Sequence, residues 1–207
     1  MSFKVTGLLL AGGTSSRLGG GDKALRLLGG RPLLDHVLER FAPQVDPLLF
    51  NTNGDPARFA PRTFTIVADT LPDHPGPLAG VLAGLEWIKT HGAARWLAVC
   101  PIDTPFLPLN LVARFVEHAE QAMAPAAYAT SNGAAHPVFS LWRSDLTLNL
   151  HRALMERGER KVRRFLADVG AIAVDWPGEV PDPFFNVNTP DDLERAEQLL
   201  NEKGREP

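Results

Sequence analysis

One loop near the start of the chain combines the residue types that bind a polyphosphate. The apolar run Val5 to Leu10 is followed by a segment with five glycines and two cations, which ends at Lys23. Glycine lets the backbone approach a ligand closely, and successive exposed N–H groups form a concavity that binds anions. Arg17 and Lys23 add two positive charges where phosphate oxygens would lie. We therefore predict that residues 8–23 hold a polyphosphate.

The loop departs from two familiar phosphate-binding patterns. The Walker pattern places lysine between glycine and serine or threonine, whereas Lys23 stands between Asp22 and Ala24. The dinucleotide pattern G-x-G-x-x-G also fails, because two polar residues follow the pair Gly12-Gly13. The alternative is a glycine-rich surface turn with incidental charges. The preceding strand and the enclosed arginine and lysine favour phosphate binding over that alternative.

Polar side chains follow three other predicted strands where each strand ends. Asn51, Asp69 and Asp103 all occupy such positions. Ligands bind at the carboxyl edge of open α/β sheets, and the glycine loop leaves the first strand at the same edge. We therefore expect four strand ends to meet at one crevice. As single residues, Asn51 and Asp69 could instead only cap strand-to-helix turns.

Asp103 is the candidate metal ligand. It lies in the segment C-P-I-D-T-P, where the two flanking prolines stiffen the backbone. Magnesium prefers oxygen ligands and commonly binds one or two carboxylates together with substrate phosphates. An ordinary Asp-Thr-Pro turn is the alternative. The position after a buried strand, in a chain with a polyphosphate loop, favours the metal interpretation.

Short apolar runs that alternate with helical periodicity predict an α/β fold built on one sheet. Strands are expected at 5–10, 48–50, 65–68, 96–99, 126–129, 138–142 and 171–174. Helices are expected at 33–41, 78–89, 109–122, 146–157 and 161–167, with a last helix that opens at Pro190 behind Thr189 as N-cap. Asn132-Gly133 predicts a hairpin turn between two of the strands.

Composition places the chain among soluble globular proteins of one domain. It has 207 residues, of which 44% are hydrophobic and 22% charged, and its net charge of -3 does not predict nucleic-acid binding. The single cysteine, Cys100, excludes an intrachain disulfide and fits a reducing cytoplasm. A signal peptide and a membrane-spanning run of about 20 apolar residues are not expected.

At these residues the chain resembles the nucleotidyltransferases that activate small molecules with a nucleoside triphosphate. Their signature loop is L-A-G-G-x-S-x-R-L/M-G-x-x-D-K, and the version here is most similar to that of the molybdenum cofactor guanylyltransferases. The segments C-P-x-D-T-P and G-P-L-A-G, at 100–105 and 76–80, extend the match. Leu18 departs from the frequent methionine, a change between apolar residues of similar volume.

The resemblance implies a fold and a reaction. The fold is a three-layer α/β/α Rossmann-like arrangement with a mostly parallel central sheet. The reaction is transfer of GMP from GTP to the molybdenum-molybdopterin cofactor, with magnesium on Asp103 and with release of pyrophosphate. Arg17 and Lys23 would offset the charge of the leaving pyrophosphate. Residues 1–125 would bind the nucleotide, and residues 126–201 the acceptor, within one domain that spans 1–207.

The resemblance also implies individual contacts. Nucleotide contacts fall at Leu10, Ala11, Gly12, Gly13, Lys23, Asn51, Asp69, Gly76, Gly80 and Asp103. Asp69 could alternatively support the metal region without touching the metal, and the Gly76 to Gly80 turn could be an ordinary helix start. Looser matches around H-P, G-E-R and N-V-N-T-P imply acceptor contacts at His136, Asn186 and Asn188. A basic run such as 157–164 is more often a solvated surface.

Partners and alternatives complete the expectations. The resemblance implies a cytoplasmic enzyme that makes transient contact with cofactor-delivery and molybdoenzyme-maturation proteins, and that binds neither nucleic acid nor membrane. Base selectivity rests on the resemblance alone. One alternative is a nucleotidyltransferase that uses CTP or another triphosphate with a different phosphorylated acceptor. Another is a nucleotide-binding or delivery protein without catalytic activity, which would need the loop but not Asp103.

Overall fold

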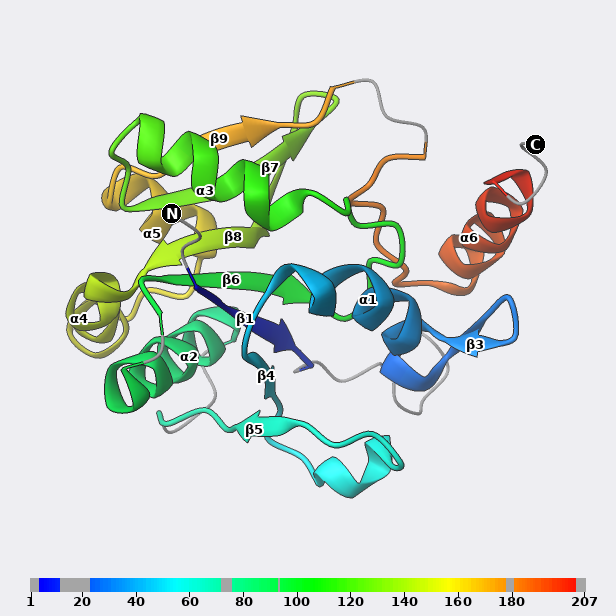
Figure 1. The fold of residues 1–207 in the computed structure, drawn as a ribbon, viewed down its shortest axis with the longest axis horizontal. Coiled ribbons are helices and arrows are strands. Elements are labelled where there is room, and N and C mark those ends of the chain that lie inside the picture. Colours follow the sequence, from blue (N-terminus) through cyan, green and yellow to red (C-terminus); the bar gives the residue numbers. More distant parts are fainter. Residues whose placement is uncertain (1–3, 12–22, 72–75, 93, 178–180, 204–207) are drawn as a thin grey trace.

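A seven-stranded sheet forms the centre of the computed structural model, which describes residues 4–11, 23–71, 76–92, 94–177 and 181–203 (Figure 1). Its strands are β1 (Val5–Leu10), β4 (Leu48–Asn51), β5 (Thr65–Val67), β6 (Trp96–Pro101), β7 (Ala126–Ser131), β8 (Ala134–Arg143) and β9 (Ile172–Asp175). The helices are α1 (Leu33–Phe41), α2 (Pro77–His91), α3 (Leu111–Gln121), α4 (Thr147–Arg157), α5 (Val162–Asp168) and α6 (Pro190–Lys203). The described ranges also contain four short 3-10 helices, Lys23–Leu25, Ala42–Gln44, Pro56–Phe59 and Ser144–Leu146. Every strand and helix expected from the sequence is present, with ends that shift by a few residues.

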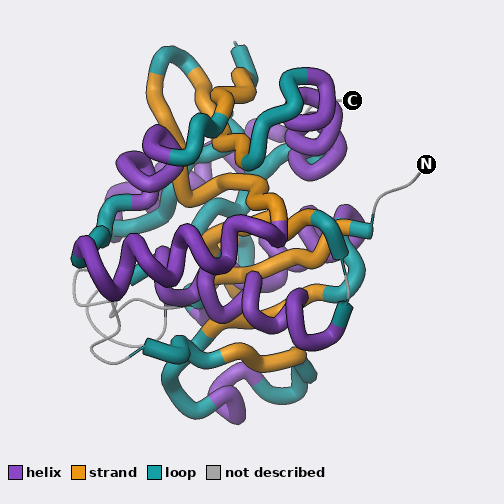
Figure 2. Tube along the Cα trace, turned by 90° about the vertical axis from the view of Figure 1, so that its left-hand side faces the viewer, coloured by secondary structure: helices purple, strands orange, loops and turns teal. Residues whose placement is uncertain are grey.

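The sheet is mostly parallel and has the strand order β5-β4-β1-β6-β8-β7-β9. β8 alone runs against its neighbours, β6 and β7. The chain proceeds from β1 to β4 on one side and reaches β6 on the other, so the strand order reverses beside β1. In open α/β sheets a ligand crevice forms at such a reversal. Figure 2 shows the strands stacked one above another through the middle of the molecule.

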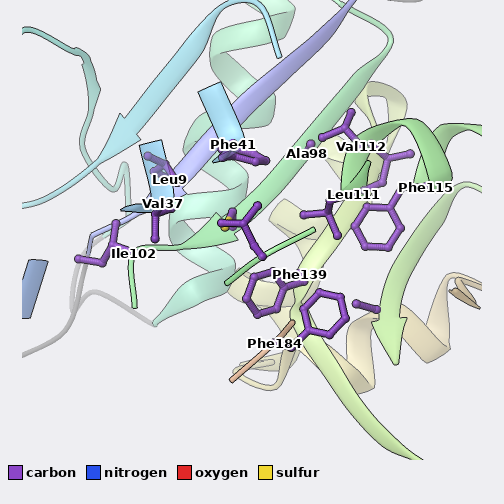
Figure 3. Packing of buried hydrophobic residues seen from close by; sticks show 14 of the residues in the cluster. Leu9, Val37, Phe41, Ala98, Ile102, Leu111, Val112, Phe115, Phe139 and Phe184 are labelled. Carbon is purple, nitrogen blue, oxygen red and sulfur yellow. The ribbon is translucent and has the colours of Figure 1, made fainter. Parts of the chain in front are cut away.

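Side chains of alternate residues along each strand build two cores, one on each face of the sheet. Leu9 of β1 faces a core that it shares with residues of α1 and α3, among them Val37, Phe41 and Phe115 (Figure 3). Leu8 faces the opposite core, which contains apolar residues of α2, α4 and α5. This alternation follows from the period of two in a strand. The two helical layers around one sheet confirm the three-layer α/β/α Rossmann-like fold.

Helix α2 lies close to the sheet because small residues line its first turns. The helix is opened by Pro77 after Gly76, whose φ of 84° favours glycine, and it is closed by Gly92 in the left-handed conformation. A Cβ atom at Gly84 would lie 3.0 Å from Leu97 Cδ2, and one at Gly80 would lie 2.4 Å from Asn51 Oδ1. Because Gly80 and Gly84 have no side chains, α2 can lie this close to the strand ends.

The hairpin of β7 and β8 is longer than the sequence pattern predicts. Its turn residues Asn132 and Gly133 both have positive φ, 48° and 77°, which is the requirement of the expected tight hairpin turn. The strands pair directly from this turn, so His136 lies inside β8 and not before it. The pairing register shifts between Tyr128 and Ala129. The irregularity accommodates Pro137, which cannot donate to a regular strand ladder.

A third, smaller core attaches the last helix to the rest of the molecule. Two short antiparallel strands, β2 (Leu27–Leu28) and β3 (Arg31–Pro32), form a ribbon that the sequence pattern did not predict. Residues of this ribbon and of α1 pack with Phe106, Val187 and the apolar face of α6. The packing brings the segment before α6 beside the segment that follows β6. In the described ranges, none of the helices combines the length and apolar character that a membrane crossing requires.

Helix α4 offers a test of the packing on its own face. Leu150 is fully buried, whereas Leu148 on the same helix is 56% exposed. We expect Leu150→Ala to lower the free energy of unfolding by about 2–5 kcal/mol, because the change leaves a cavity. Leu148→Ala, the matched control, should change it by less than about 0.5 kcal/mol. Urea denaturation followed by circular dichroism measures both, and equal losses would contradict the packing described for α4.

Candidate active site

The carboxyl ends of four parallel strands lie level with one another. Leu10, the last residue of β1, pairs with Asn51 on one side and with Pro101 on the other. Asn51 in turn pairs with Val67 at the end of β5. Ala11 continues this alignment through a hydrogen bond from its N–H to the Asn51 carbonyl at 2.9 Å. The residues that follow these strands therefore emerge at one edge, as the sequence predicts.

Lys23, Asp103 and Asn188 meet at this edge from three distant parts of the chain. Lys23 Nζ lies 2.5 Å from Asp103 Oδ2, and it also donates a hydrogen bond to Asn188 Oδ1. The side chains of Lys23 and Asp103 are only 15% and 16% exposed. Lys23 follows the glycine loop, Asp103 follows β6, and Asn188 precedes α6. The contact between Lys23 and Asn188 therefore joins the two halves of the sequence in one site.

Asp103 is held from several directions. The Val187 N–H donates to the Asp103 carbonyl at 2.9 Å, which fixes the backbone. The Thr104 hydroxyl lies 3.3 Å from Asp103 Oδ1 and 3.0 Å from the Asn186 amide. With its nitrogen turned toward these acceptors, the Asn186 amide donates to both Thr104 Oγ1 and the Asp103 carboxylate. Asp103 thus has a fixed position and a side chain that faces the site.

The start of α6 holds Asn188 in place. Asp192 Oδ2 accepts hydrogen bonds from the N–H groups of Asn188 at 2.9 Å and Thr189 at 2.8 Å. Thr189 Oγ1 accepts in return from the Asp192 N–H at 3.1 Å, which completes a reciprocal cap and confirms Thr189 as the N-cap. Burial acts to raise the pKa of Asp192, but these hydrogen bonds and the charge of Lys23 outweigh it, so the pKa is lowered.

A second polar network fixes the ends of β4 and β5. Asn51 Nδ2 donates to the Val67 carbonyl at 3.0 Å and to Asp69 Oδ1 at 2.9 Å. Asn53 Nδ2 donates to Asp69 Oδ2 at 2.8 Å, and Asn53 Oδ1 accepts from the Asp69 N–H at 2.9 Å. Gly80 lies against this network, because any side chain there would meet Asn51 Oδ1 and Leu10 Cδ2. Asn53 is a supporting residue that the sequence analysis did not identify.

His136 lies in a separate cluster at the β7/β8 hairpin. Its Nε2 is 2.7 Å from Ser131 Oγ, and the Ser131 hydroxyl in turn lies 2.9 Å from Asp182 Oδ2. The imidazole stacks on Phe184 at 4.9 Å between ring centroids. Burial lowers the pKa of His136, and the Asp182 carboxylate only partly opposes this effect. Sequence reasoning missed Asp182, although the flanking prolines of P-D-P resemble those around Asp103.

The remaining predicted residues divide into three groups. Leu10, Ala11, Gly76 and Gly80 lie where expected, at the strand ends and the start of α2. Gly12, Gly13 and Arg17 lie outside the described residues. Cys100 is fully buried, and burial raises the pKa of its thiol well above the usual 9.0, with the charge of Asp103 adding to the effect. Burial and a raised pKa both disfavour the reactive thiolate, and Cys100 packs as a core residue.

The oxygen-rich group around Asp103 is suited to a hard cation. Within the described ranges, no three His, Cys, Asp or Glu side chains are grouped so that they could hold a metal ion. The arrangement instead offers one carboxylate and the amide oxygen of Asn188, which converge on the Lys23 ammonium. Magnesium is typically bound by one or two carboxylates, with phosphates and waters as further ligands. The donor set therefore fits a magnesium ion that arrives with a phosphorylated ligand.

Comparison with known proteins decides the family. The model of the MobA-like NTP transferase domain matches residues 7–174. The chain belongs to the MobA-like NTP transferase family. It is 50% identical over 193 residues to the molybdenum cofactor guanylyltransferase of Rhodopseudomonas palustris (strain HaA2), a match that covers 93% of this chain and 90% of that relative. It is 48% identical over 204 residues to the guanylyltransferase of Bradyrhizobium sp. (strain ORS 278), covering 98% and 96% of the two chains.

Solved structures of MobA-like and related transferases share the fold. Molybdopterin-guanine dinucleotide biosynthesis protein A from Archaeoglobus fulgidus superposes with a TM-score of 0.74 at 26% identity, covering 95% of this chain and 99% of that chain. A CMP:2-keto-3-deoxy-manno-octonic acid synthetase complexed with CTP superposes with a TM-score of 0.72 at 19% identity, covering 97% and 99%. The second likeness concerns the fold alone.

Gly80 tests the close approach of α2 to Asn51. Alanine is favoured over glycine inside a helix by about 0.5–1 kcal/mol, so Gly→Ala alone should stabilise α2. At Gly80, however, the new Cβ would lie 2.4 Å from Asn51 Oδ1. We expect Gly80→Ala to destabilise the protein by about 1–3 kcal/mol. The matched control, Gly84→Ala, faces leucine methyl groups at 3.0 Å or more and should be clearly less destabilising in urea titrations.

Asp192 gives the cap a measurable pH dependence. A carboxyl whose pKa is lowered by folding contributes stability above its unfolded pKa and loses that contribution as the pH falls through its folded pKa. Asp192→Asn should therefore reduce the free energy of unfolding at pH 7 by about 0.5–2 kcal/mol. The difference from wild type should shrink as the pH falls below 3.8, the ordinary pKa. Asp191→Asn removes the same charge one residue earlier and should have a smaller effect; a difference independent of pH would exclude the ionised cap.

Proposed function

We propose that this protein transfers GMP from GTP to the molybdopterin form of the molybdenum cofactor, yielding molybdopterin guanine dinucleotide and pyrophosphate. The observation that carries the proposal is the junction of Lys23, Asp103 and Asn188 at the carboxyl edge of the sheet. This junction adjoins the segment with the family's loop, in a chain 50% identical to a molybdenum cofactor guanylyltransferase. The likeness in sequence supports guanine and molybdopterin, and the site geometry supports nucleotidyl transfer.

The proposed chemistry is an in-line displacement at phosphorus. An oxygen of the acceptor phosphate attacks the α-phosphorus of GTP, the bond from that phosphorus to the α–β bridging oxygen breaks, and pyrophosphate leaves with that oxygen. An ionised phosphate needs no general base, so the protein acts by positioning and by neutralising charge. Lys23, together with Arg17 of the loop, offsets the charge that builds on the leaving group.

Asp103 and the Asn188 amide oxygen are the residues that would hold magnesium. When bound, the ion supplies positive charge to the phosphates of the nucleotide. The Asn186 amide holds the carboxylate of Asp103 and the Val187 N–H holds its backbone, while Asp192 fixes the backbone of Asn188. The proposed dependence on magnesium rests on this donor set and on the family.

Nucleotide and acceptor occupy different parts of the chain in this proposal. Residues 1–125 provide the loop and the strand ends, where Asn51, Asp69, Gly76 and Gly80 would contact the nucleotide. Residues 126–201 provide His136, Asn186 and Asn188 for the acceptor. The contact between Asn188 and Lys23 supports this division within a single domain, because Lys23 is the residue proposed to bind the phosphates and Asn188 belongs to the proposed acceptor segment. Cofactor-delivery and molybdoenzyme-maturation proteins in the cytoplasm are the proposed transient partners.

Turnover of the purified protein tests the proposal. With magnesium, GTP and molybdenum-loaded molybdopterin, we expect the guanine dinucleotide and pyrophosphate, detected by chromatography. GTP should also raise the melting temperature more than CTP at equal concentration, because a ligand with a smaller dissociation constant stabilises the folded protein more. Turnover with CTP in place of GTP would refute the guanine assignment and favour a different nucleotidyltransferase.

Asp103→Asn separates catalysis from mere nucleotide binding. The substitution keeps the size of the side chain but removes its charge, and we expect kcat to fall by about 100-fold or more. The control Asp145→Asn makes the same change at an exposed carboxylate paired with Arg143, and it should retain wild-type activity. Unchanged turnover in Asp103→Asn would remove this carboxylate from the mechanism. Thermal unfolding of both variants confirms that each is folded.

A further inference from the structure

The Lys23 ammonium contacts the same two oxygen atoms that are proposed to bind the metal. Its ammonium lies 2.5 Å from Asp103 Oδ2 and also contacts Asn188 Oδ1. The ion pair is largely shielded from water, since the two side chains are only 15% and 16% exposed. The other carboxylate oxygen, Asp103 Oδ1, faces Thr104 at 3.3 Å and the Asn186 amide. Lys23 therefore bridges Asp103 Oδ2 and the amide oxygen of Asn188.

We propose that Lys23 is a tethered cation that keeps a divalent metal off Asp103 until a triphosphate draws it away. The inference rests on the proposed function, because it takes Asp103 as the metal ligand and phosphates as the alternative partner of Lys23. In this arrangement the metal binds weakly by itself and strongly together with the nucleotide. Lys23 thereby acts as a positioning residue for the metal, in addition to its contact with the phosphates.

Two cations cannot share Asp103 Oδ2 without strong repulsion. Magnesium binds oxygen at about 2.0–2.1 Å, and the ammonium already lies 2.5 Å from the same atom. A metal on that oxygen would therefore be less than about 5 Å from the ammonium. Like charges at such a distance repel strongly where water is largely excluded. Either Lys23 leaves or the metal stays out.

A triphosphate provides the alternative partner. It carries several negative charges, whereas Asp103 carries one, and ammonium–phosphate contacts are strong charge-assisted hydrogen bonds. Lys23 has four methylene groups between its backbone and its charge, so its ammonium can move while the backbone stays. Hydrogen bonds from Val187 N–H and to Asp192 fix the backbones of Asp103 and Asn188, and the Asn186 amide holds the Asp103 carboxylate, so the carboxylate stays at the site when Lys23 departs. Metal and nucleotide binding are then coupled, and each favours the other.

Binding of Mn²⁺ without nucleotide or acceptor tests the exchange directly. Electron paramagnetic resonance measures free Mn²⁺ in titrations of wild type and of Lys23→Met, which retains an apolar stem of similar length. We expect Lys23→Met to bind one Mn²⁺ at least tenfold more tightly than wild type. In the double variant Lys23→Met/Asp103→Asn this gain should disappear. A Lys23→Met affinity equal to that of wild type would overturn the proposal.

Arg31→Met is the control for net charge. Arg31 pairs with Glu39, and removing it changes the charge of the protein by the same amount. Its Mn²⁺ affinity should equal that of wild type; a gain equal to that of Lys23→Met would mean that overall charge, and not occupancy of Asp103, governs the affinity. Because this assay contains no GTP or molybdopterin, its result is independent of turnover. If wild type shows no turnover but Lys23→Met still binds Mn²⁺ more tightly than wild type, the proposed function is refuted and the exchange of Lys23 for the metal is retained.

Chemical labelling of wild type gives a second measurement that does not depend on the folding of Lys23→Met. Acetylation by an amine-reactive reagent, read by mass spectrometry, reports how accessible each ammonium is. We expect Lys23 to react several-fold more slowly than Lys89, which lies exposed on α2. Asp103→Asn should speed the reaction of Lys23 and leave that of Lys89 unchanged. Equal rates at Lys23 in the two proteins would contradict the ion pair on which the proposal depends.

Discussion

The ion pair between Lys23 and Asp103 connects the parts of this molecule that have to act together. It joins the end of the glycine loop to the end of β6, and through Asn188 it also reaches the segment before α6. The pair is stable in a largely dry position because each charge has its partner and further hydrogen bonds. The surrounding structure serves to keep these few atoms at one place: Val187 and Asn186 hold Asp103, and Asp192 holds Asn188.

The sheet and α2 supply the frame for this site. Level pairing of Leu10 with Asn51 and with Pro101 brings the strand ends together. The two small residues Gly80 and Gly84 let α2 approach the strands, so the start of the helix lies beside Asn51. A side chain at Gly80 would separate helix and strand. The polar network of Asn51 and Asp69 thus depends on the absence of a side chain as much as on the groups that form hydrogen bonds.

Much of this architecture follows from local patterns. The periods of two and 3.6 predicted the strands and helices, and Asn132-Gly133 predicted the hairpin, because its turn needs residues that accept positive φ. Local patterns did not predict two features of the fold. The β2/β3 ribbon is too short to have a periodicity of its own. His136 was placed before a strand, but pairing from the tight turn extends β8 through it, and an irregularity accommodates Pro137.

The sequence by itself determined the fold class, the strand ends that carry polar groups, and the family, since these depend on local periodicity and on motifs within short segments. Only the tertiary structure decided which distant residues touch. Lys23 and Asn188 are separated by 165 positions, and their contact depends on how α6 packs against the β2/β3 ribbon. Likewise, no local pattern indicates that His136 joins Ser131 and Asp182. Such contacts arise from the packing of whole elements, because burial of apolar surface, and not the polar residues themselves, sets how the elements lie.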